Sequence, residues 1–247
     1  MADTSMLDES RAMGEYMALQ SDPVLQGQGV PHGEGRRVLV IPGLLGNDFY
    51  LMTVRMWLAR IGYKPMASEI FLNVGCPRRI ADQVMRIVDR ELERDASAIS
   101  IVGHSRGGLL GKALASHLGN KVSHLVLVGS PLGGFLNVGP QGVSAFADFM
   151  RGGSEAQEWV VNTAMSATRL FDPDCNSPEC ACSYYENLYK APDVQTRVTA
   201  IYSQEDPIVP PASAHMPYGE NIVVGGTHSG LMFNAEVYPH IANALAD

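Results

Sequence analysis

The chain is poor in the features that mark several classes of protein. Only 18 of its 247 residues are lysine or arginine, against 26 aspartates and glutamates, which gives a formal net charge of −8. Binding to nucleic-acid phosphates needs clustered lysine and arginine, so we expect no nucleic-acid partner. The first residues, MADTSMLDESRAMGEYMALQSD, carry acidic side chains and no continuous apolar stretch. They predict neither a secretory signal nor a transmembrane segment, and we expect a cytoplasmic protein.

Cysteine is also scarce, with four residues in the whole chain. Cys175, Cys180 and Cys182 crowd into DPDCNSPECAC, whereas Cys76 stands alone. In a reducing cytosol we favour free thiols. A disulfide from Cys175 to Cys180 or Cys182 stays open, as does a structural metal, although the spacing is not a CxxC pair and no histidine lies nearby. None of these interpretations indicates a function.

The pattern of apolar residues indicates one mixed domain. A chain with 46% hydrophobic and 18% charged residues is typical of a globular protein that buries one sizeable core. Short apolar runs predict strands at 36–43, 64–70, 97–103, 122–130, 197–203 and 220–226. Longer amphipathic stretches predict helices at 48–62, 77–95, 156–171 and 236–247, with another starting after residue 105. This alternation favours an α/β fold with a mostly parallel sheet of about six strands and helices on both faces.

Two intervals fall outside this alternation. Residues 131–196 separate two predicted strands, and we interpret them as a helical cap insertion over the carboxyl edge of the sheet. Residues 1–35 precede the first strand and are expected to form an extension that packs on the core. The apolar residues for that packing are Met6, Leu7, Met13, Tyr16, Met17 and Leu19. Residues 36–247 would then form a single domain.

One serine lies between glycines where a strand runs into a helix. The segment SIVGHSRGGLLG places Ser105 in a GxSxG pattern, which is typical of a nucleophile elbow that presents the serine hydroxyl above the sheet edge. Small flanking residues are needed because bulky side chains would collide with the neighbouring strand or helix. A plain Gly-Ser turn is the alternative, but the strand before and the helix after favour a nucleophile. His104, at the variable position, is expected to support or pack rather than act as a base.

A nucleophilic serine needs a base, and the base needs an acid to orient it. Asp206 lies in YSQEDPIVPP after one predicted strand, and His228 lies in GGTHSGLM after the next. The chain order Ser105, Asp206, His228 matches the order for this motif class. Glu205 and His215 are the less favoured alternatives for the acid and the base.

Acyl transfer also needs donors aimed at the oxyanion that develops on the substrate. The backbone amide of Arg106 directly follows the serine, and the turn in IPGLLGNDF offers the amide of Leu44. A simple Pro-Gly turn is the alternative for PGLLG. The side chain of Arg106 could pair with a carboxylate or face solvent.

Four residues are candidates for contact with the substrate, each with a structural alternative. They are Leu45, Asn73, Phe135 and Leu136. For Asn73 a loop-structuring role is favoured over a substrate contact. The apolar residues of GGFLNVGP could line an acyl pocket, or they could only pack the cap onto the core.

Together the motifs GHSRGG, PGLLG and YSQEDPIVP resemble the α/β-hydrolase superfamily, in particular small lipase-like serine esterases, over residues 36–247. The resemblance implies that Ser105 attacks an ester carbonyl, His228 acts as base and then acid, and Asp206 orients His228. It also implies that the amides of Leu44 and Arg106 bind the oxyanion, with no metal or cofactor. Many lipases of this kind have His before the glycine of the oxyanion turn, where this chain has Pro42.

We therefore expect an enzyme that hydrolyses small-molecule or lipid carboxylic esters with apolar acyl chains through an acyl-enzyme. The antiparallel strands that open the family fold are not evident before residue 36, which predicts a minimal core. An acyltransferase or a thioesterase with the same triad is the alternative enzyme. A non-catalytic interaction protein on a hydrolase scaffold is the third hypothesis, and the intact set of three residues argues against it.

Overall fold

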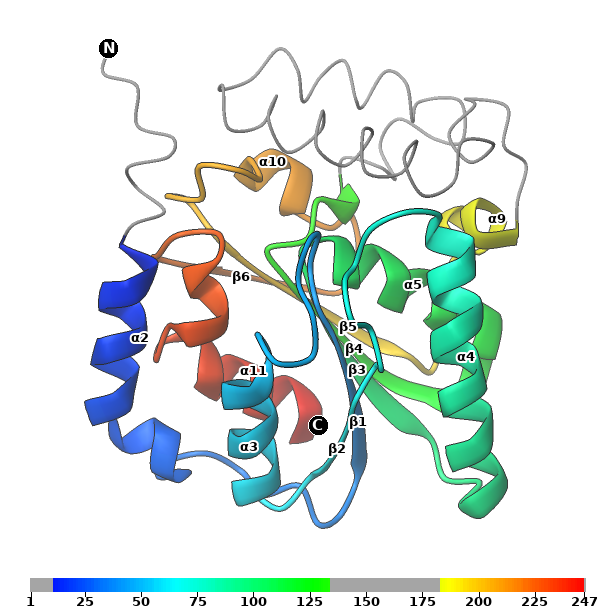
Figure 1. Cartoon of the computed structure of the whole chain (residues 1–247), viewed down its shortest axis with the longest axis horizontal. Coiled ribbons are helices and arrows are strands. Elements are labelled where there is room, and N and C mark those ends of the chain that lie inside the picture. The colour runs from blue at the N-terminus through cyan, green and yellow to red at the C-terminus, as the bar shows by residue number, and fades with distance from the viewer. Residues whose placement is uncertain (1–10, 134–182, 247) are drawn as a thin grey trace.

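The structure is a computed structural model, and it describes residues 11–133 and 183–246. At its centre lies a sheet of six strands in the order β2-β1-β3-β4-β5-β6, and every neighbouring pair is parallel (Figure 1). The strands are β1 (Arg37–Ile41), β2 (Lys64–Met66), β3 (Ile99–His104), β4 (Val122–Val128), β5 (Arg197–Ser203) and β6 (Glu220–Val224). Because all strands run the same way, the loops that follow them gather at one edge of the sheet.

The strand order reverses between β1 and β3. From β1 the chain moves outward to β2, then crosses back to β3 and continues in the opposite direction through β4, β5 and β6. At such a switch point the loops after the two adjoining strands diverge, and the crevice between them is where α/β proteins bind ligands. The predicted oxyanion turn follows β1 and the predicted nucleophile follows β3, so both lie at this switch point.

Helices cover both faces of the sheet (Figure 1). They are α2 (Ala12–Ser21), η1 (Pro23–Gln26), α3 (Met52–Arg60), α4 (Pro77–Arg94), α5 (Arg106–Leu118), η2 (Gly119–Lys121), α9 (Ser183–Tyr189), α10 (Pro211–Ala214), η4 (Gly230–Phe233) and α11 (Val237–Ala246). Along β1, Leu39 and Ile41 pack into one core cluster with α4, α5 and α9, while Val38 and Val40 pack into a second with α3 and α11. Alternate strand residues point to opposite faces, so both faces need apolar side chains. This requirement explains why the central strands are continuous apolar runs.

The α/β architecture and the six parallel strands confirm the fold predicted from the sequence, and the two largest differences in element bounds lie at the start of one helix and the end of one strand. The helix predicted at 48–62 begins only at Met52, because the side chain of Asn47 accepts the backbone N–H of Tyr50 and bends the chain into turns. The strand predicted at 64–70 ends at Met66. Beyond it, Ser68 binds the carboxylate of Asp48 through both its N–H and its hydroxyl, which takes the chain out of the ladder.

The N-terminal segment packs against the second core cluster. Leu19 of α2 is fully buried, and the indole N–H of Trp57 donates to the carbonyl of Val24 in η1 at 2.8 Å. Met13 and Met17 do not share in this packing, since they are 68% and 62% exposed. Met6 and Leu7 lie outside the described residues.

Most of the predicted cap falls outside the described residues, including the helix expected at 156–171 and the cysteines at 175, 180 and 182. From this interval the structure describes residues 131–133 and 183–196, and the second of these stretches contains α9. Within the described parts of the chain, no helix has both the length and the apolar character that a membrane span requires.

Candidate active site

Ser105 occupies a strained turn between β3 and α5. Its backbone has φ 52° and ψ −123°, a region that residues with a side chain adopt only at a cost. A Cβ added to Gly103 would lie 2.6 Å from the carbonyl oxygen of Gly107, and one added to Gly107 would overlap the carbonyl oxygen of Ile41. Only glycine fits at these two places, as the steric argument from the sequence predicted. The turn places Ser105 at the carboxyl edge of the sheet, where it is partly exposed.

The loops after β5 and β6 bring the other two predicted residues to Ser105. Nε2 of His228 lies 2.9 Å from Oγ of Ser105, and Nδ1 of His228 lies 2.7 Å from Oδ2 of Asp206. A carboxylate only accepts hydrogen bonds, so Nδ1 carries the proton and the lone pair of Nε2 faces the serine hydroxyl. The three side chains form one hydrogen-bonded chain from carboxylate to hydroxyl.

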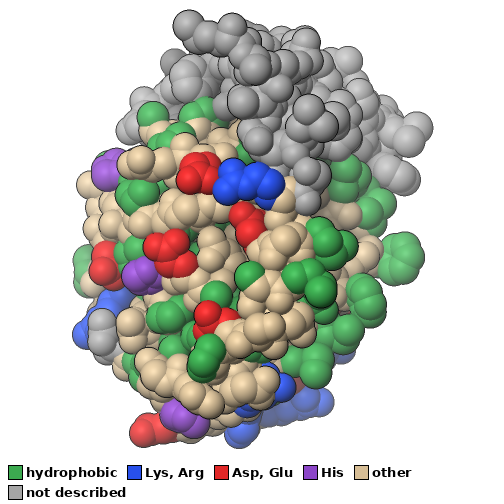
Figure 2. Space-filling view, turned by 90° about the vertical axis from the view of Figure 1, so that its left-hand side faces the viewer, with side chains coloured by type: hydrophobic (Ala, Val, Ile, Leu, Met, Phe, Trp, Pro, Cys, Tyr) green, Lys and Arg blue, Asp and Glu red, His purple; other side chains and the backbone are tan. Residues whose placement is uncertain are grey.

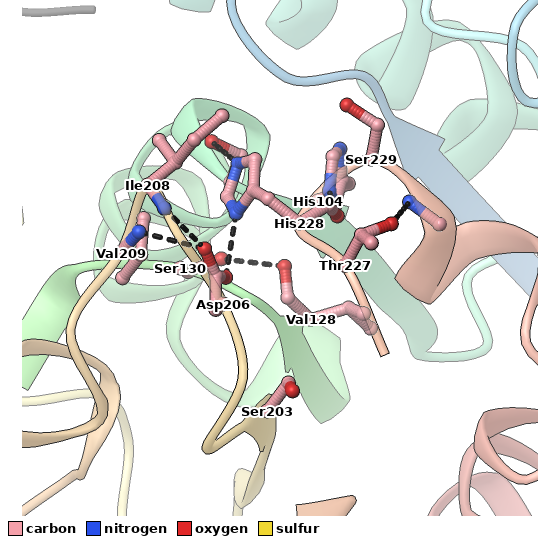
Figure 3. Close-up of polar contacts among 12 residues, drawn as sticks. His104, Val128, Ser130, Ser203, Asp206, Ile208, Val209, Thr227, His228 and Ser229 are labelled. Carbon is pink, nitrogen blue, oxygen red and sulfur yellow. Dashed lines mark hydrogen bonds and ion pairs between the residues drawn. The ribbon is translucent and has the colours of Figure 1, made fainter. Parts of the chain in front are cut away.

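Asp206 is held from the other side by its own loop. Its Oδ1 accepts the backbone N–H groups of Ile208 and Val209, both at 2.8 Å (Figure 3). The side chain of Asp206 is 1% exposed and that of His228 is 7% exposed. The charged acid is thus shielded from solvent, and its second oxygen is left to orient the imidazole.

The loop that carries His228 is anchored by aromatic side chains from elsewhere in the fold. Nε2–H of His104 donates to the carbonyl oxygen of His228 at 3.0 Å, and the hydroxyl of Tyr50 donates to that of Ser229 at 2.6 Å. His104 therefore directs its ring at the backbone of residues 225–229, the loop after β6 that we call the histidine loop, and not at Ser105. Sequence analysis missed Tyr50, because its contact with Ser229 spans 179 positions and leaves no local pattern.

His104 is a neutral imidazole in the folded protein. Burial and, to a smaller extent, the neighbouring His228 lower the pKa of His104 to about 3, although the hydrogen bond to the His228 carbonyl opposes this shift. In the unfolded chain the pKa returns to about 6.5. Between these two pH values the unfolded chain binds a proton that the folded protein does not bind.

This difference predicts a loss of stability in mild acid. As the pH falls below 6.5, protonation of His104 favours the unfolded state, and the free energy of unfolding decreases by about 2 kcal/mol from this group between pH 7 and pH 5. His104→Gln keeps an N–H donor but does not titrate, so its unfolding free energy should fall less over that range. Urea titrations at a series of pH values measure both slopes. His32→Gln, at an exposed position, is the control, and parallel profiles for wild type and His104→Gln would contradict the assignment.

The turn after β1 lies directly beside Ser105. A Cβ added to Gly43 would approach the Cβ of Ser105 to 3.0 Å. The turn closes with a hydrogen bond from the N–H of Gly46 to the carbonyl of Gly43 at 3.0 Å. Within the described residues, the N–H of Leu44 makes no hydrogen bond. The role of this N–H in binding an oxyanion stays a prediction.

Asn73 braces this turn from beneath. The side-chain Nδ2 of Asn73 donates to the carbonyl of Pro42 at 2.7 Å. The backbone carbonyl of Asn73 accepts the N–H of Leu45 at 3.2 Å, and its backbone N–H donates to the carbonyl of Gly46 at 2.9 Å. Asn73 is fully buried, whereas Leu45 is 40% exposed and has φ 59°. The other two candidates for substrate contact, at positions 135 and 136, lie outside the described residues.

Arg106 uses its guanidinium to hold the same loop. It donates to the carbonyl oxygens of Asn73 at 3.2 Å and of Gly75 at 2.6 Å. From the sequence, we left open whether this side chain pairs with a carboxylate or faces solvent. The structure shows instead that it binds these two backbone carbonyls. The amide of Arg106 is the first of α5, where the partial positive charge of the helix is concentrated. Among the described residues, no group of three or more His, Cys, Asp or Glu side chains is arranged to hold a metal ion.

Solved structures with a similar fold include several hydrolases. A monoacylglycerol lipase from Paleococcus ferrophilus is 17% identical and superposes with a TM-score of 0.55, over 87% of this chain and 96% of the lipase. An extracellular α/β-hydrolase from a Paenibacillus species is 15% identical, with a TM-score of 0.51 over 85% of this chain and 98% of the other. A thioesterase domain from the curacin biosynthetic pathway is 19% identical, with a TM-score of 0.52 over 88% and 93%.

These likenesses show that the chain has the α/β-hydrolase fold. The sequence matches no protein-family model, and it matches no curated protein at a significant level. One fold hosts many chemistries, so the function has to be argued from the site.

Proposed function

We propose that the protein is a serine hydrolase that cleaves carboxylic esters through an acyl-enzyme on Ser105. The observation that carries the proposal is the hydrogen-bonded chain from Asp206 through His228 to Ser105, with distances of 2.7 and 2.9 Å. These are the lengths at which a base can take a proton from a hydroxyl as the hydroxyl attacks.

In the first half of the reaction, Oγ of Ser105 attacks the ester carbonyl carbon while Nε2 of His228 takes the hydroxyl proton. The resulting imidazolium is stabilised by the carboxylate of Asp206. The tetrahedral intermediate collapses as His228 returns the proton to the departing alcohol. In the second half, His228 takes a proton from water, the water oxygen attacks the acyl carbon, and the acid leaves as Ser105 regains its proton.

The negative oxygen of the intermediate would be bound by the backbone amides of Leu44 and Arg106. Two features support this assignment. The turn that carries Leu44 lies against Ser105 and its N–H makes no hydrogen bond within the described residues. Arg106 opens α5, so its amide adds the partial charge of a helix N-terminus.

Exposed apolar side chains beside the oxyanion turn support an apolar substrate. Leu45 and Phe49 lie in the loop after β1, and Phe71 and Leu72 lie in the loop after β2, with exposed fractions of 40, 76, 91 and 41%. Hydrogen bonds join the two loops, among them one from the N–H of Asp48 to the carbonyl of Ile70. In Figure 2, hydrophobic side chains form a run along the right-hand edge of the surface. Such side chains offer contacts to a hydrocarbon chain as it approaches Ser105.

The rates of hydrolysis of p-nitrophenyl esters of increasing acyl length test the reaction and its selectivity. We expect kcat/KM to peak at medium or long acyl chains. Phe71→Ala should lower kcat/KM for the longer esters about three- to tenfold, as expected for partial loss of an apolar contact, with little effect on the acetate. Val194→Ala, at a fully exposed site, is the control. A preference for the acetate would refute the proposed apolar substrate site but not the hydrolase reaction. No turnover of any ester would refute the hydrolase reaction itself.

A further inference from the structure

The N-terminal helix reaches the histidine loop through one carboxylate. Oε1 of Glu15 in α2 accepts the backbone N–H of Thr227 at 2.9 Å, and Oε2 accepts the hydroxyl of Thr227 at 2.8 Å. Thr227 directly precedes His228 and is 1% exposed. Both oxygens of a single carboxylate therefore hold the residue next to the base.

The loop is shaped around that carboxylate. A Cβ added to Gly230 would overlap Oε2 of Glu15, and one added to Gly226 would lie 3.0 Å from Oε1. Gly226 has φ 107°, which favours glycine for a second reason. The hydroxyl of Thr227 also accepts the N–H of Gly230 at 3.1 Å. Glu15, Thr227 and Gly230 thus form one continuous chain of hydrogen bonds across the loop.

The other contacts of α2 bear less directly on the site. Leu19 and the edge-to-face pair of Tyr16 with Phe233, at 5.4 Å between ring centroids, pack the helix onto the core. Arg11 pairs at 3.0 Å with Glu205, in the loop after β5 that also carries Asp206, but the side chains of this pair are 56% and 53% exposed. An ion pair so open to solvent contributes little.

Three successive residues of the histidine loop are held by side chains from three different parts of the chain. Glu15 of α2 holds Thr227, His104 of β3 holds the carbonyl of His228, and Tyr50, which precedes α3, holds the carbonyl of Ser229. The backbone on both sides of the imidazole is therefore fixed from outside the loop. Its ring can reach both Asp206 and Ser105 only when that backbone is in place.

We propose that Glu15 is a positioning residue for His228, and that helix α2 is part of the working active site. The inference rests on the proposed serine hydrolase function. Without the carboxylate, Thr227 loses two hydrogen bonds and the loop is free to shift. A displacement of about 1 Å in a reacting group can lower a rate by about 100-fold, and we expect about a tenth of that effect because two of the three anchors remain.

The second-order rate of labelling by a fluorophosphonate probe tests the inference, together with kcat and KM for p-nitrophenyl butyrate. The probe reports how well Ser105 is activated, independently of acyl-chain selectivity. Glu15→Ala should lower the labelling rate and kcat about tenfold, with KM changed less than twofold. Glu15→Gln, which keeps an acceptor for the N–H of Thr227, should recover part of the loss. Met17→Ala, on the exposed side of α2, should match wild type.

The outcomes separate this inference from the proposed function. If wild type is neither labelled nor active on any ester, the hydrolase proposal fails. If wild type is labelled and folded Glu15→Ala is labelled as fast, the positioning role fails and the hydrolase stands. Equal losses in Glu15→Ala and Met17→Ala would also overturn it, because they would indicate a general disturbance of the helix.

If Glu15→Ala does not fold, a second set of variants tests the same inference. Thr227→Val removes only the hydroxyl, and it should slow labelling to a smaller extent than Glu15→Ala. In that background Glu15→Gln should cost less than it does in wild type, because the partner of Oε2 is already gone. Fully additive effects would show that Glu15 does not act through Thr227, and would overturn the inference.

Discussion

Replacement of Ser105 by alanine should abolish ester turnover, with kcat/KM lower by about 10⁴-fold or more. In the proposed mechanism the hydroxyl oxygen forms the acyl-enzyme, and alanine offers no substitute. His228→Ala should cost a similar factor, and the double variant should be no slower than either single one, because the two side chains act as a unit. Hydrolysis of a p-nitrophenyl ester measures all three.

The fold must survive for this result to be informative. Alanine occupies the space of serine without its hydroxyl, so thermal unfolding of Ser105→Ala should stay close to that of wild type. Ser183→Ala, at an exposed position of α9, should keep full activity and controls for the loss of a serine elsewhere. Retained turnover in Ser105→Ala or in His228→Ala would remove the basis of the proposed mechanism.

The second large effect concerns stability and a lysine inside the molecule. Lys112 lies in the middle of α5 and is fully buried. Its ammonium donates to Oγ of Ser116 at 2.8 Å, to the carbonyl of Leu188 at 3.0 Å and to the carbonyl of Lys190. Those two carbonyls lie at and just beyond the last turn of α9, where a cation offsets the partial negative charge of the helix end. Burial lowers the pKa of Lys112 to about 8, so the side chain still carries its proton at pH 7.

Lys112→Met keeps the length of the side chain and removes its donors. The carbonyl of Leu188 then loses the ammonium, and the carbonyl of Lys190 keeps only the hydroxyl of Ser116 at 2.9 Å. We expect the free energy of unfolding to fall by about 3 kcal/mol. Urea denaturation should show this as a lower midpoint with an unchanged slope. Lys121→Met, at an exposed site, should change the free energy by less than about 0.5 kcal/mol. A midpoint for Lys112→Met equal to that of wild type would contradict the capping role.

Much of the fold and the central residues of the candidate site could be predicted from the sequence. Buried parallel strands are short apolar runs, so their places follow from composition along the chain. Ser105, Asp206 and His228 each follow such a run, and parallel strands direct the loops after them to one edge. Local patterns thus indicated three residues that the fold then brings within hydrogen-bond distance.

The supporting contacts could not be found in this way. Glu15 and Thr227 are 212 positions apart, and neither stands in a motif. The turn after β1 is held by Asn73, which donates to the carbonyl of Pro42, 31 positions away. From the sequence, no local pattern indicated that Asn73 would bind the carbonyl of Pro42. Such contacts arise from packing of distant segments, which periodicity and turn signals do not encode.

The strand order also has a consequence for how the protein acquires its activity during folding. The nucleophile follows β3, whereas the acid and the base follow β5 and β6 at the far side of the sheet. Parallel pairing of distant segments is slow, because long loops must close before their contacts form. A chain that has paired only β1 to β4 already holds the elbow but has no base beside it. We therefore expect the proposed esterase activity to return later than the helical signal after dilution from denaturant, because activity would require the completed sheet.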